Sequence, residues 1–196
     1  LPMVYPVGAG ESFRGVVDLL KMKLCIFEEE SRGVNVIYED VPADLLEECQ
    51  ELRRNIVERA AEQEEELLEK YCLEGDLSLP EIMRGLRKGT IARAIVPVFC
   101  GTAFKNKGMQ PLLDGICAFL PSPLDVGAIR GALNPDNIRQ PADSEPLSAL
   151  AFKVTADKHM GKIIYIRIYS GTLRMGTTFR NSSQDIDVRM GRLLRM

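Results

Sequence analysis

Several residue types that support catalysis or cross-linking are scarce in this sequence. Tryptophan is absent from the 196 residues, and histidine occurs once, at His159. A single histidine excludes metal sites built on several histidines, and its place in a polar turn favours a solvated side chain. The five cysteines are an odd number without C-x-x-C spacing, which favours reduced, mostly buried thiols in a cytoplasmic protein over a disulfide framework or a zinc site.

Long apolar runs and phosphate-binding motifs are also missing. No run reaches the roughly 18 residues that a membrane-spanning helix needs, and no signal peptide opens the chain, so we expect no membrane contact. The chain has neither the G-x-x-x-x-G-K-[ST] loop nor the G-x-G-x-x-G turn. We therefore assign no catalytic residue and no metal ligand. Cys49 and Cys72 fall on or near helical apolar positions, which predicts core thiols.

The charge is unevenly distributed along the chain. Residues 1–145 carry 16 Lys and Arg against 25 Asp and Glu, a net charge of −9, whereas residues 146–196 carry 9 against 3, a net charge of +6. This asymmetry indicates two units with different partners, because an acidic face attracts basic proteins and a basic one attracts phosphates. Simple solvation of both surfaces is the alternative.

The first 93 residues read as a strand region followed by helices. The β-branched and aromatic segments predict strands over residues 2–7, 13–19, 22–27 and 34–38. The apolar spacing then predicts one helix over residues 45–71, capped by Asp44 and ended by Gly75. The Ser78–Glu81 spacing is that of a capping box, and it predicts a second helix that stops at Gly89.

A strand–loop–helix unit follows. The apolar run at residues 94–99 predicts a strand buried on both faces. A polar loop over residues 101–108 then leads to a helix whose inward side chains are expected to be Met109, Leu112, Leu113, Ile116 and Leu120. Residues 122–145 contain three prolines and many polar residues, which is typical of a linker.

The last 51 residues return to alternating apolar and polar positions. They predict strands over residues 147–155, 162–169, 177–181 and 186–194, too few to close a barrel. Unclosed strand edges are templates for pairing between chains, so we expect self-association. The fold class is therefore mixed α+β and α/β, followed by a partial antiparallel β-barrel.

An acidic face on the predicted long helix is a candidate docking surface. It comprises Glu47, Glu51, Glu58, Glu62, Glu65, Glu66 and Glu69. Like charges four residues apart destabilise a helix slightly, so a basic partner would explain the pattern. A solvated outer face is the simpler alternative.

Seen as a family match, the most specific segment is Cys-Gly-Thr-Ala-Phe-Lys-Asn-Lys-Gly at residues 100–108. Together with Gln-Pro-Leu-Leu-Asp at 110–114, Leu-Pro-Ser-Pro-Leu-Asp-Val at 120–126 and Tyr-Ser-Gly-Thr-Leu at 169–173, it resembles bacterial elongation factor G, the translocation GTPase of translation. Further matches lie at residues 13–18, 69–71, 87–91, 148–154 and 191–196.

The resemblance implies an internal fragment, in keeping with a chain that begins at Leu1. Residues 1–93 would be a subdomain inserted in the GTPase domain, and 94–121 the last strand and helix of its core. Residues 122–145 would be a linker, and 146–196 the start of the β-barrel second domain. The phosphate loop, switch regions and Asn-Lys-x-Asp motif of the family are absent. GTP or GDP with Mg would be bound by the intact protein, and we expect none on this chain alone.

The resemblance also implies sites and partners. The guanine-side loop of the family maps onto Gly101, Thr102, Ala103 and Phe104, with the Ala103 N–H donating to guanine O6. The inserted subdomain resembles a docking surface for the basic C-terminal domain of the ribosomal stalk protein, and an i, i+4, i+8 stripe of Glu58, Glu62 and Glu66 is the expected contact.

The basic end resembles the barrel that faces small-subunit ribosomal RNA. Its cations are Lys153, Lys158, Lys162, Arg167, Arg174, Arg180, Arg189, Arg192 and Arg195. The expected function of the intact protein is ribosome-dependent GTP hydrolysis that promotes tRNA–mRNA translocation in the cytoplasm. The alternatives are a non-catalytic ribosome-docking paralogue, or a related ribosome-protection or release-factor GTPase.

Overall fold

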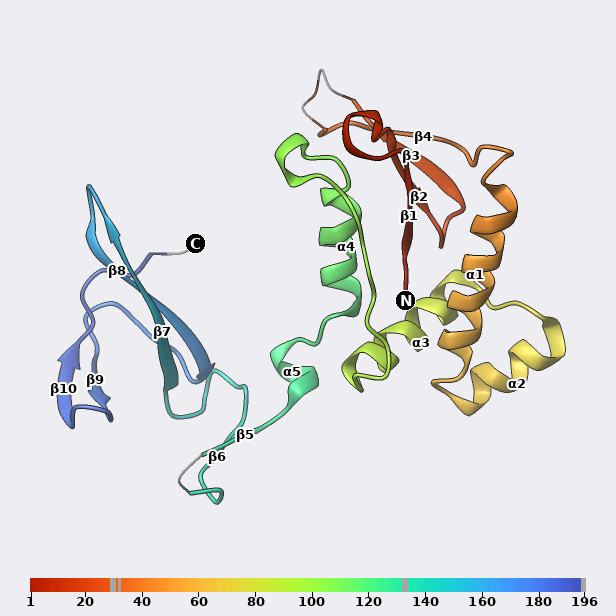
Figure 1. The fold of residues 1–196 in the computed structure, drawn as a ribbon. Helices are drawn as coiled ribbons and strands as arrows, with labels where there is room; N and C mark the ends of the chain where they lie inside the picture. The colour runs from red at the N-terminus through yellow and green to blue at the C-terminus, as the bar shows by residue number, and fades with distance from the viewer. Residues whose placement is uncertain (29–30, 32, 132–133, 195–196) are drawn as a thin grey trace. The chain divides into compact units, whose positions relative to one another are not determined.

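The computed structural model describes residues 1–28, 31, 33–131 and 134–194. These residues fold as two compact units, residues 1–120 and residues 121–196, which are described separately. The architecture is mixed α+β, as the sequence predicts: one four-stranded antiparallel sheet with helices in the first unit, and small antiparallel sheets in the second (Figure 1).

The sheet of the first unit is a simple antiparallel meander. Its strand order follows the sequence, and the register sets Val16 opposite Cys25 and Cys25 opposite Tyr38. All four strands that the sequence predicts in this region are confirmed. They are β1 (Val4–Val7), β2 (Gly15–Asp18), β3 (Lys23–Phe27) and β4 (Val36–Asp40).

The two faces of this sheet are both largely apolar. Because neighbouring side chains of a strand point to opposite faces, Val17 and Leu24 join the main core, whereas Val16 and Cys25 join a second, smaller cluster. The main core also contains Ile56 of α1 (Leu46–Ala61) and residues of α2 (Glu65–Glu74) and α3 (Leu79–Ile91). The sheet is therefore held in place by the helices that follow it.

The single helix expected over residues 45–71 is wrong, because the chain turns at residues 62–64 (Figure 1). The N–H groups of Gln63 and Glu64 donate to the carbonyls three residues back, and Glu64 is extended, with φ −145° and ψ 133°. The turn lets both α1 and α2 contribute buried side chains, Ala60 from one and Leu67 from the other. The seven-residue spacing between these two positions hides the break in the sequence pattern.

The helix boundaries follow the predicted signals in part. Gly75 ends α2 in the left-handed region, with φ 77°, as expected. The residue at the N-terminal cap of α1 is Leu45 rather than Asp44, and its side chain makes no capping hydrogen bond. Gly89 does not stop α3, which continues to Ile91. Gly89 is instead buried inside the helix, where it faces Ile95.

A close approach of α1 and α3 explains another glycine. A Cβ atom on Gly85 would lie 2.3 Å from the Ala60 carbonyl oxygen and 2.8 Å from its carbonyl carbon. Backbone atoms cannot move aside as a flexible side chain can, so the two helices approach this closely only with glycine at this position.

We therefore predict that Gly85→Ala lowers the free energy of unfolding. Overpacking typically costs about 1–3 kcal/mol, which exceeds the gain of up to about 1 kcal/mol in helix propensity. Gly89→Ala is the matched control, because its Cβ would meet movable side-chain atoms of Ile95 and Gln63. Urea unfolding of the two variants should show the larger loss for Gly85→Ala; an equal or smaller loss would contradict the close-approach explanation.

The capping box that begins α3 is confirmed, and its Glu81 side chain also binds a residue of α2. The Glu81 carboxylate accepts hydrogen bonds from the Ser78 backbone N–H at 2.8 Å and from the Ser78 hydroxyl at 2.5 Å. Its other oxygen lies 2.8 Å from Lys70 Nζ of α2. The hydrogen bond from Lys70 is the largest cause that lowers the pKa of Glu81 to about 2, and the Ser78 bonds add to it.

This pKa predicts how acid affects stability. Because the pKa of Glu81 is about 2 when folded and ordinarily 4.5, its stabilising effect is complete above pH 4.5 and is lost as the pH falls from 4.5 toward 2. We expect Glu81→Gln to lower the free energy of unfolding at pH 7 and to do so less at pH 3. Urea titrations at both pH values measure this, with Glu69→Gln on the exposed surface of α2 as control. A loss that does not shrink at pH 3 would contradict the assignment.

The segment at residues 94–99 differs from the expected doubly buried strand. It runs parallel to residues 1–3: the Leu1 amino group donates to Val96 O at 2.9 Å, and the Met3 N–H donates to Val98 O at 2.9 Å. Ile95 is buried, but Val96 is 70% exposed and Val98 is 51% exposed. The prediction fails because residues 1–3 are the only segment that pairs with this run among the described residues.

Helix α4 (Met109–Phe119) is confirmed, but its inward face is not the predicted one. Leu113, Ile116 and Leu120 are exposed, whereas Gly115 and Phe119 are buried. The Arg87 side chain of α3 donates to Ala118 O at 2.8 Å and to Leu120 O at 3.3 Å. These bonds satisfy carbonyls at the C-terminal end of α4 and fix its position against α3.

The described residues of the second unit form one helical turn and three two-stranded sheets. Part of the segment expected to be a linker is ordered as α5 (Pro123–Val126) and the pair β5 (Ile129–Arg130) and β6 (Ile138–Arg139). Four longer strands follow where the sequence predicts them, although the last is shorter than expected. They are β7 (Ser148–Asp157), β8 (Gly161–Ser170), β9 (Thr178–Asn181) and β10 (Ile186–Arg189).

These four strands form two separate hairpins rather than one continuous sheet. β7 pairs with β8, with register irregularities at residues 148–149 and 151–153, and β9 pairs with β10. No closed barrel is present in the part of the chain that the structure describes. The antiparallel strands of the expected partial barrel are confirmed, but they pair as separate two-stranded sheets.

Candidate functional site

The loop between residues 100 and 109 is tightly closed on itself. The Thr102 N–H donates to Lys107 O at 2.8 Å, and the Lys107 N–H donates back to Thr102 O at 3.1 Å. Between them, Ala103–Lys105 form one 3₁₀ turn and Asn106 is left-handed, with φ 54°. A Cβ atom on Gly101 would lie 2.5 Å from Lys107 O, so a glycine is needed where the loop closes.

The four residues predicted to recognise guanine are contiguous on this loop. Gly101, Ala103 and Phe104 are exposed, and Thr102 is half-buried. Within the described residues the Ala103 N–H has no hydrogen-bond acceptor, so it is free to donate to a ligand. The loop therefore offers the backbone donor that recognition of a carbonyl oxygen such as guanine O6 requires.

The predicted acidic stripe of Glu58, Glu62 and Glu66 does not exist as one helical face. Glu58 lies on α1, Glu62 is the residue that caps its end, and Glu66 lies on α2. Arg59 Nη1 lies 2.9 Å from Glu62 Oε2, and Arg84 Nη2 lies 3.1 Å from Glu66 Oε2. All three side chains are exposed, but only Glu58 has no ion pair among the described residues.

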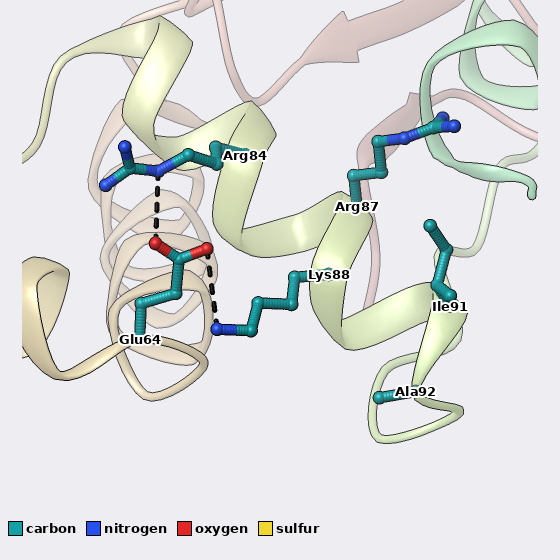
Figure 2. A pocket seen from close by; sticks show the side chains of 6 residues that line it. All are labelled: Glu64, Arg84, Arg87, Lys88, Ile91 and Ala92. Atoms are coloured by element: carbon teal, nitrogen blue, oxygen red, sulfur yellow. Dashed lines mark ion pairs between the residues drawn. The ribbon is translucent and has the colours of Figure 1, made fainter. Parts of the chain in front are cut away.

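A charged pocket of about 420 Å³ lies on α3, and Arg84 in its lining also pairs with Glu66 of the predicted acidic stripe. Figure 2 shows the Glu64 carboxylate between two cations, with Arg84 Nε at 3.2 Å and Lys88 Nζ at 3.6 Å. Arg87, Ile91 and Ala92 form the other side. Glu64 partly neutralises the charges of Arg84 and Lys88, and Arg87 donates a hydrogen bond to α4. The charged groups of this pocket therefore serve chiefly to join helices to one another.

The β7–β8 hairpin combines cations with aromatic rings. Lys153 lies directly opposite Tyr165 in the register, with its Nζ atom 5.3 Å from the ring centre. Arg167 lies over the ring of Tyr169 at 5.2 Å. Phe152 adds a third ring, whose centre is 6.3 Å from that of Tyr165. We name these five residues the aromatic–cation surface.

The cations of this surface are predicted from the sequence, but their aromatic partners are not. The two-residue spacing of Tyr165, Arg167 and Tyr169 on a predicted strand was the signal available for finding them. Among the other cations, Arg180 lies within 3.2 Å of both Asp185 and Asp187, which leaves it less available. Arg195 lies outside the described residues.

The cysteines are all free, and they divide by burial. Cys25 and Cys49 are buried, and burial raises the pKa of both thiols and that of Cys100, which disfavours the reactive thiolate. Cys72 and Cys117 are exposed, so the expectation of a core position for Cys72 is wrong. Cys72 lies two residues before the end of α2. The buried side chain of this helix is Leu67, so the side of α2 that packs against the core is the one that carries Leu67.

In the described residues, no group of three or more His, Cys, Asp or Glu side chains could hold a metal ion. No helix of these residues is both long and apolar enough to cross a bilayer.

Comparison with known proteins gives a specific match for the second unit and a structural likeness for nearly the whole chain. Residues 146–196 match the family model of elongation factor G domain 2. The fold resembles the crystal structure of a protein from Thermus thermophilus, with a TM-score of 0.73 and 27% sequence identity. The similarity covers 97% of this chain and 26% of that one, so the chain spans about a quarter of the length of the solved protein. The C-terminal segment is thus like domain 2 of elongation factor G, which relates the chain to the translational GTPases.

Proposed function

We propose that this chain is part of a translational GTPase of the elongation factor G class, whose intact form binds and hydrolyses GTP on the ribosome to promote tRNA–mRNA translocation. The match of residues 146–196 to domain 2 of that factor is the observation that carries the proposal. The order of the quoted motifs along residues 13–173 and the structural likeness over 97% of the chain support it. A cytoplasmic location follows from a role on the ribosome.

Under this proposal the loop at residues 101–104 contacts the guanine base. The Ala103 N–H, which has no acceptor in the described residues, donates to guanine O6. An adenine amino group at the same place would bring two donors together and be rejected. The phosphates of GTP and their Mg ion would be held by parts of the intact protein other than these residues, so no catalytic step is assigned to this chain.

Two alternative functions make predictions that differ from those of the proposed elongation factor G function. A non-catalytic ribosome-docking paralogue would share the fold but lack a phosphate loop and an Asn-Lys-x-Asp motif in the gene sequence that precedes Leu1. A ribosome-protection or release-factor GTPase would have both motifs there, and would differ in its effect on translation. Reading that sequence separates the docking paralogue from the GTPases, and a translocation assay separates the GTPases from one another.

The aromatic–cation surface is the proposed contact with small-subunit ribosomal RNA. Tyrosine rings stack on unpaired bases, and Lys153 and Arg167 are exposed cations that attract phosphates. Ribosome binding through this surface accounts for the positive charge of residues 146–196.

We predict that Lys153→Gln together with Arg167→Gln weakens binding of the chain to small ribosomal subunits at least about ten-fold, and that binding of the unmodified chain falls steeply with salt. Arg180→Gln is the matched control, because Arg180 is already paired with Asp185 and Asp187. Co-sedimentation over a salt series measures both effects. Equal binding of the double variant and the control would sink the assignment of this surface.

The acidic end of α1 is the proposed contact for the basic C-terminal domain of the ribosomal stalk protein. Glu58 is exposed and without an ion pair in the described residues, and Glu62 lies one turn further on. Glu66 is separated from them by the turn at residues 62–64 and is paired with Arg84, so we expect it to contribute least.

Open strand edges of the two hairpins provide a further proposed contact, between copies of this chain.

Neutralising two of these charges tests the stalk contact. We expect Glu58→Gln with Glu62→Gln to weaken the affinity for the isolated stalk-protein domain about three- to ten-fold at low salt, since each lost exposed ion pair contributes up to about 1 kcal/mol. Glu11→Gln, an exposed change on another part of the unit, serves as control. Titration calorimetry that shows unchanged affinity for the double variant would overturn this contact.

A further inference from the structure

A cavity of about 200 Å³ lies inside the first unit, between the sheet and α4. The sheet contributes Val4 and Cys25 to its wall, α4 contributes Gly115 and Phe119, and Phe99 comes from the segment between α3 and α4. Val4 and Cys25 belong to the smaller apolar cluster, Phe119 belongs to the main core, and Phe99 packs against both, so the cavity borders the two clusters.

The inner part of the cavity wall is apolar and well fixed. Val4 is 6% exposed, Cys25 1% and Phe119 3%. A Cβ atom on Gly115 would lie 2.3 Å from the Phe99 ring, so the ring rests directly against the α4 backbone. An enclosed apolar cavity of about 150 Å³ accommodates a benzene-sized molecule, so a space of about 200 Å³ has room for a substituted ring.

One polar atom in the lining lacks a partner. The Gln110 side chain lines the cavity from the first turn of α4, and its Nε2 atom donates to Gly33 O at 2.5 Å. This bond fixes the orientation of the amide. The other amide atom, Oε1, is buried and accepts no hydrogen bond within the described residues. A buried carbonyl oxygen without a donor is rare, because it has lost its bonds to water without replacement.

The charges at the rim limit what the cavity accepts. Asp18 and Asp114 contribute carboxylates, and Lys21 is the nearby cation. Lys21 Nζ lies 3.7 Å from Asp18 Oδ2 and 5.9 Å from the centre of the Tyr38 ring, so its charge is already compensated. An anionic ligand would therefore meet an uncompensated carboxylate and be disfavoured.

We propose that this cavity binds a small neutral aromatic molecule with one hydrogen-bond donor, of the phenol or indole class. Its ring occupies the space between Phe99, Cys25 and Phe119, and its O–H or N–H donates to Gln110 Oε1. The site is independent of the loop at residues 101–104 and of the aromatic–cation surface, so it stands or falls separately from the proposed function.

The test compares two probes of equal size, phenol and toluene, on the whole chain. Nuclear magnetic resonance titration of ¹⁵N-labelled protein follows the side-chain amide of Gln110. We expect phenol to shift this signal, and we expect Gln110→Met to change the ratio of phenol to toluene affinity about five-fold in favour of toluene, the value of one neutral hydrogen bond.

Two further variants of α4 separate the cavity from the surface. Ala118 lines the cavity, and Ala118→Leu should fill it and abolish binding of both probes. Cys117 is exposed and does not line it, so Cys117→Ser should bind both probes as the unmodified chain does. If Ala118→Leu fails to fold, the affinity ratio in Gln110→Met still decides the question. Absence of any shift of the Gln110 amide at the solubility limit of phenol, or an unchanged ratio in Gln110→Met, would overturn the proposal.

Discussion

The close approach of α1 and α3 at Gly85 is the constraint on which the first unit depends. It brings the buried side chains Ile56, Ile82 and Leu86 of the two helices together under one face of the sheet. Because α3 is fixed at this contact, polar side chains along α3 can bind neighbouring helices and hold them in position. Glu81 binds Lys70 of α2, and Arg87 binds the end of α4. Such ion pairs and hydrogen bonds make the positions of α2 and α4 more specific, after apolar burial has already determined where these helices pack.

The same constraint shapes the acidic surface. A straight helix through residue 71 would carry its glutamates in a continuous stripe. The chain turns at residues 62–64 instead: Leu67 is buried on α2, and the Glu64 carboxylate points toward Arg84 and Lys88 (Figure 2). The negative charge is thereby divided: part of it holds helices together, and the part around Glu58 stays available to a partner. Net charge alone does not reveal this division.

The second unit follows a different principle. Its hairpins bury few side chains, and Val154 and Ile164, which face one another in the register, are 62% and 54% exposed. Two-stranded hairpins have little apolar surface to bury, so their stability depends on cross-strand pairs such as Lys153 with Tyr165. The pairs that stabilise the hairpin are also those that present cations and rings to RNA under the proposed function.

The sequence by itself determined strands β1–β4 and β7–β10, the capping box at Ser78 and the left-handed end of α2 at Gly75. These features depend on residues close together in the chain: side-chain alternation, a hydrogen bond over three residues, and a glycine with positive φ. It also supplied the motifs by which the second unit resembles elongation factor G domain 2, because a motif is local by definition.

Only the tertiary structure decided the features that depend on distant partners. The break at residues 62–64 follows from burying Leu67, and the exposure of Val96 and Leu113 follows from which segments are there to cover them. The cavity lined by Gln110 arises where the sheet and α4 fail to fill the space between them. Apolar periodicity indicates which residues can be buried. Which of them are buried depends on the packing of elements that lie far apart in the sequence.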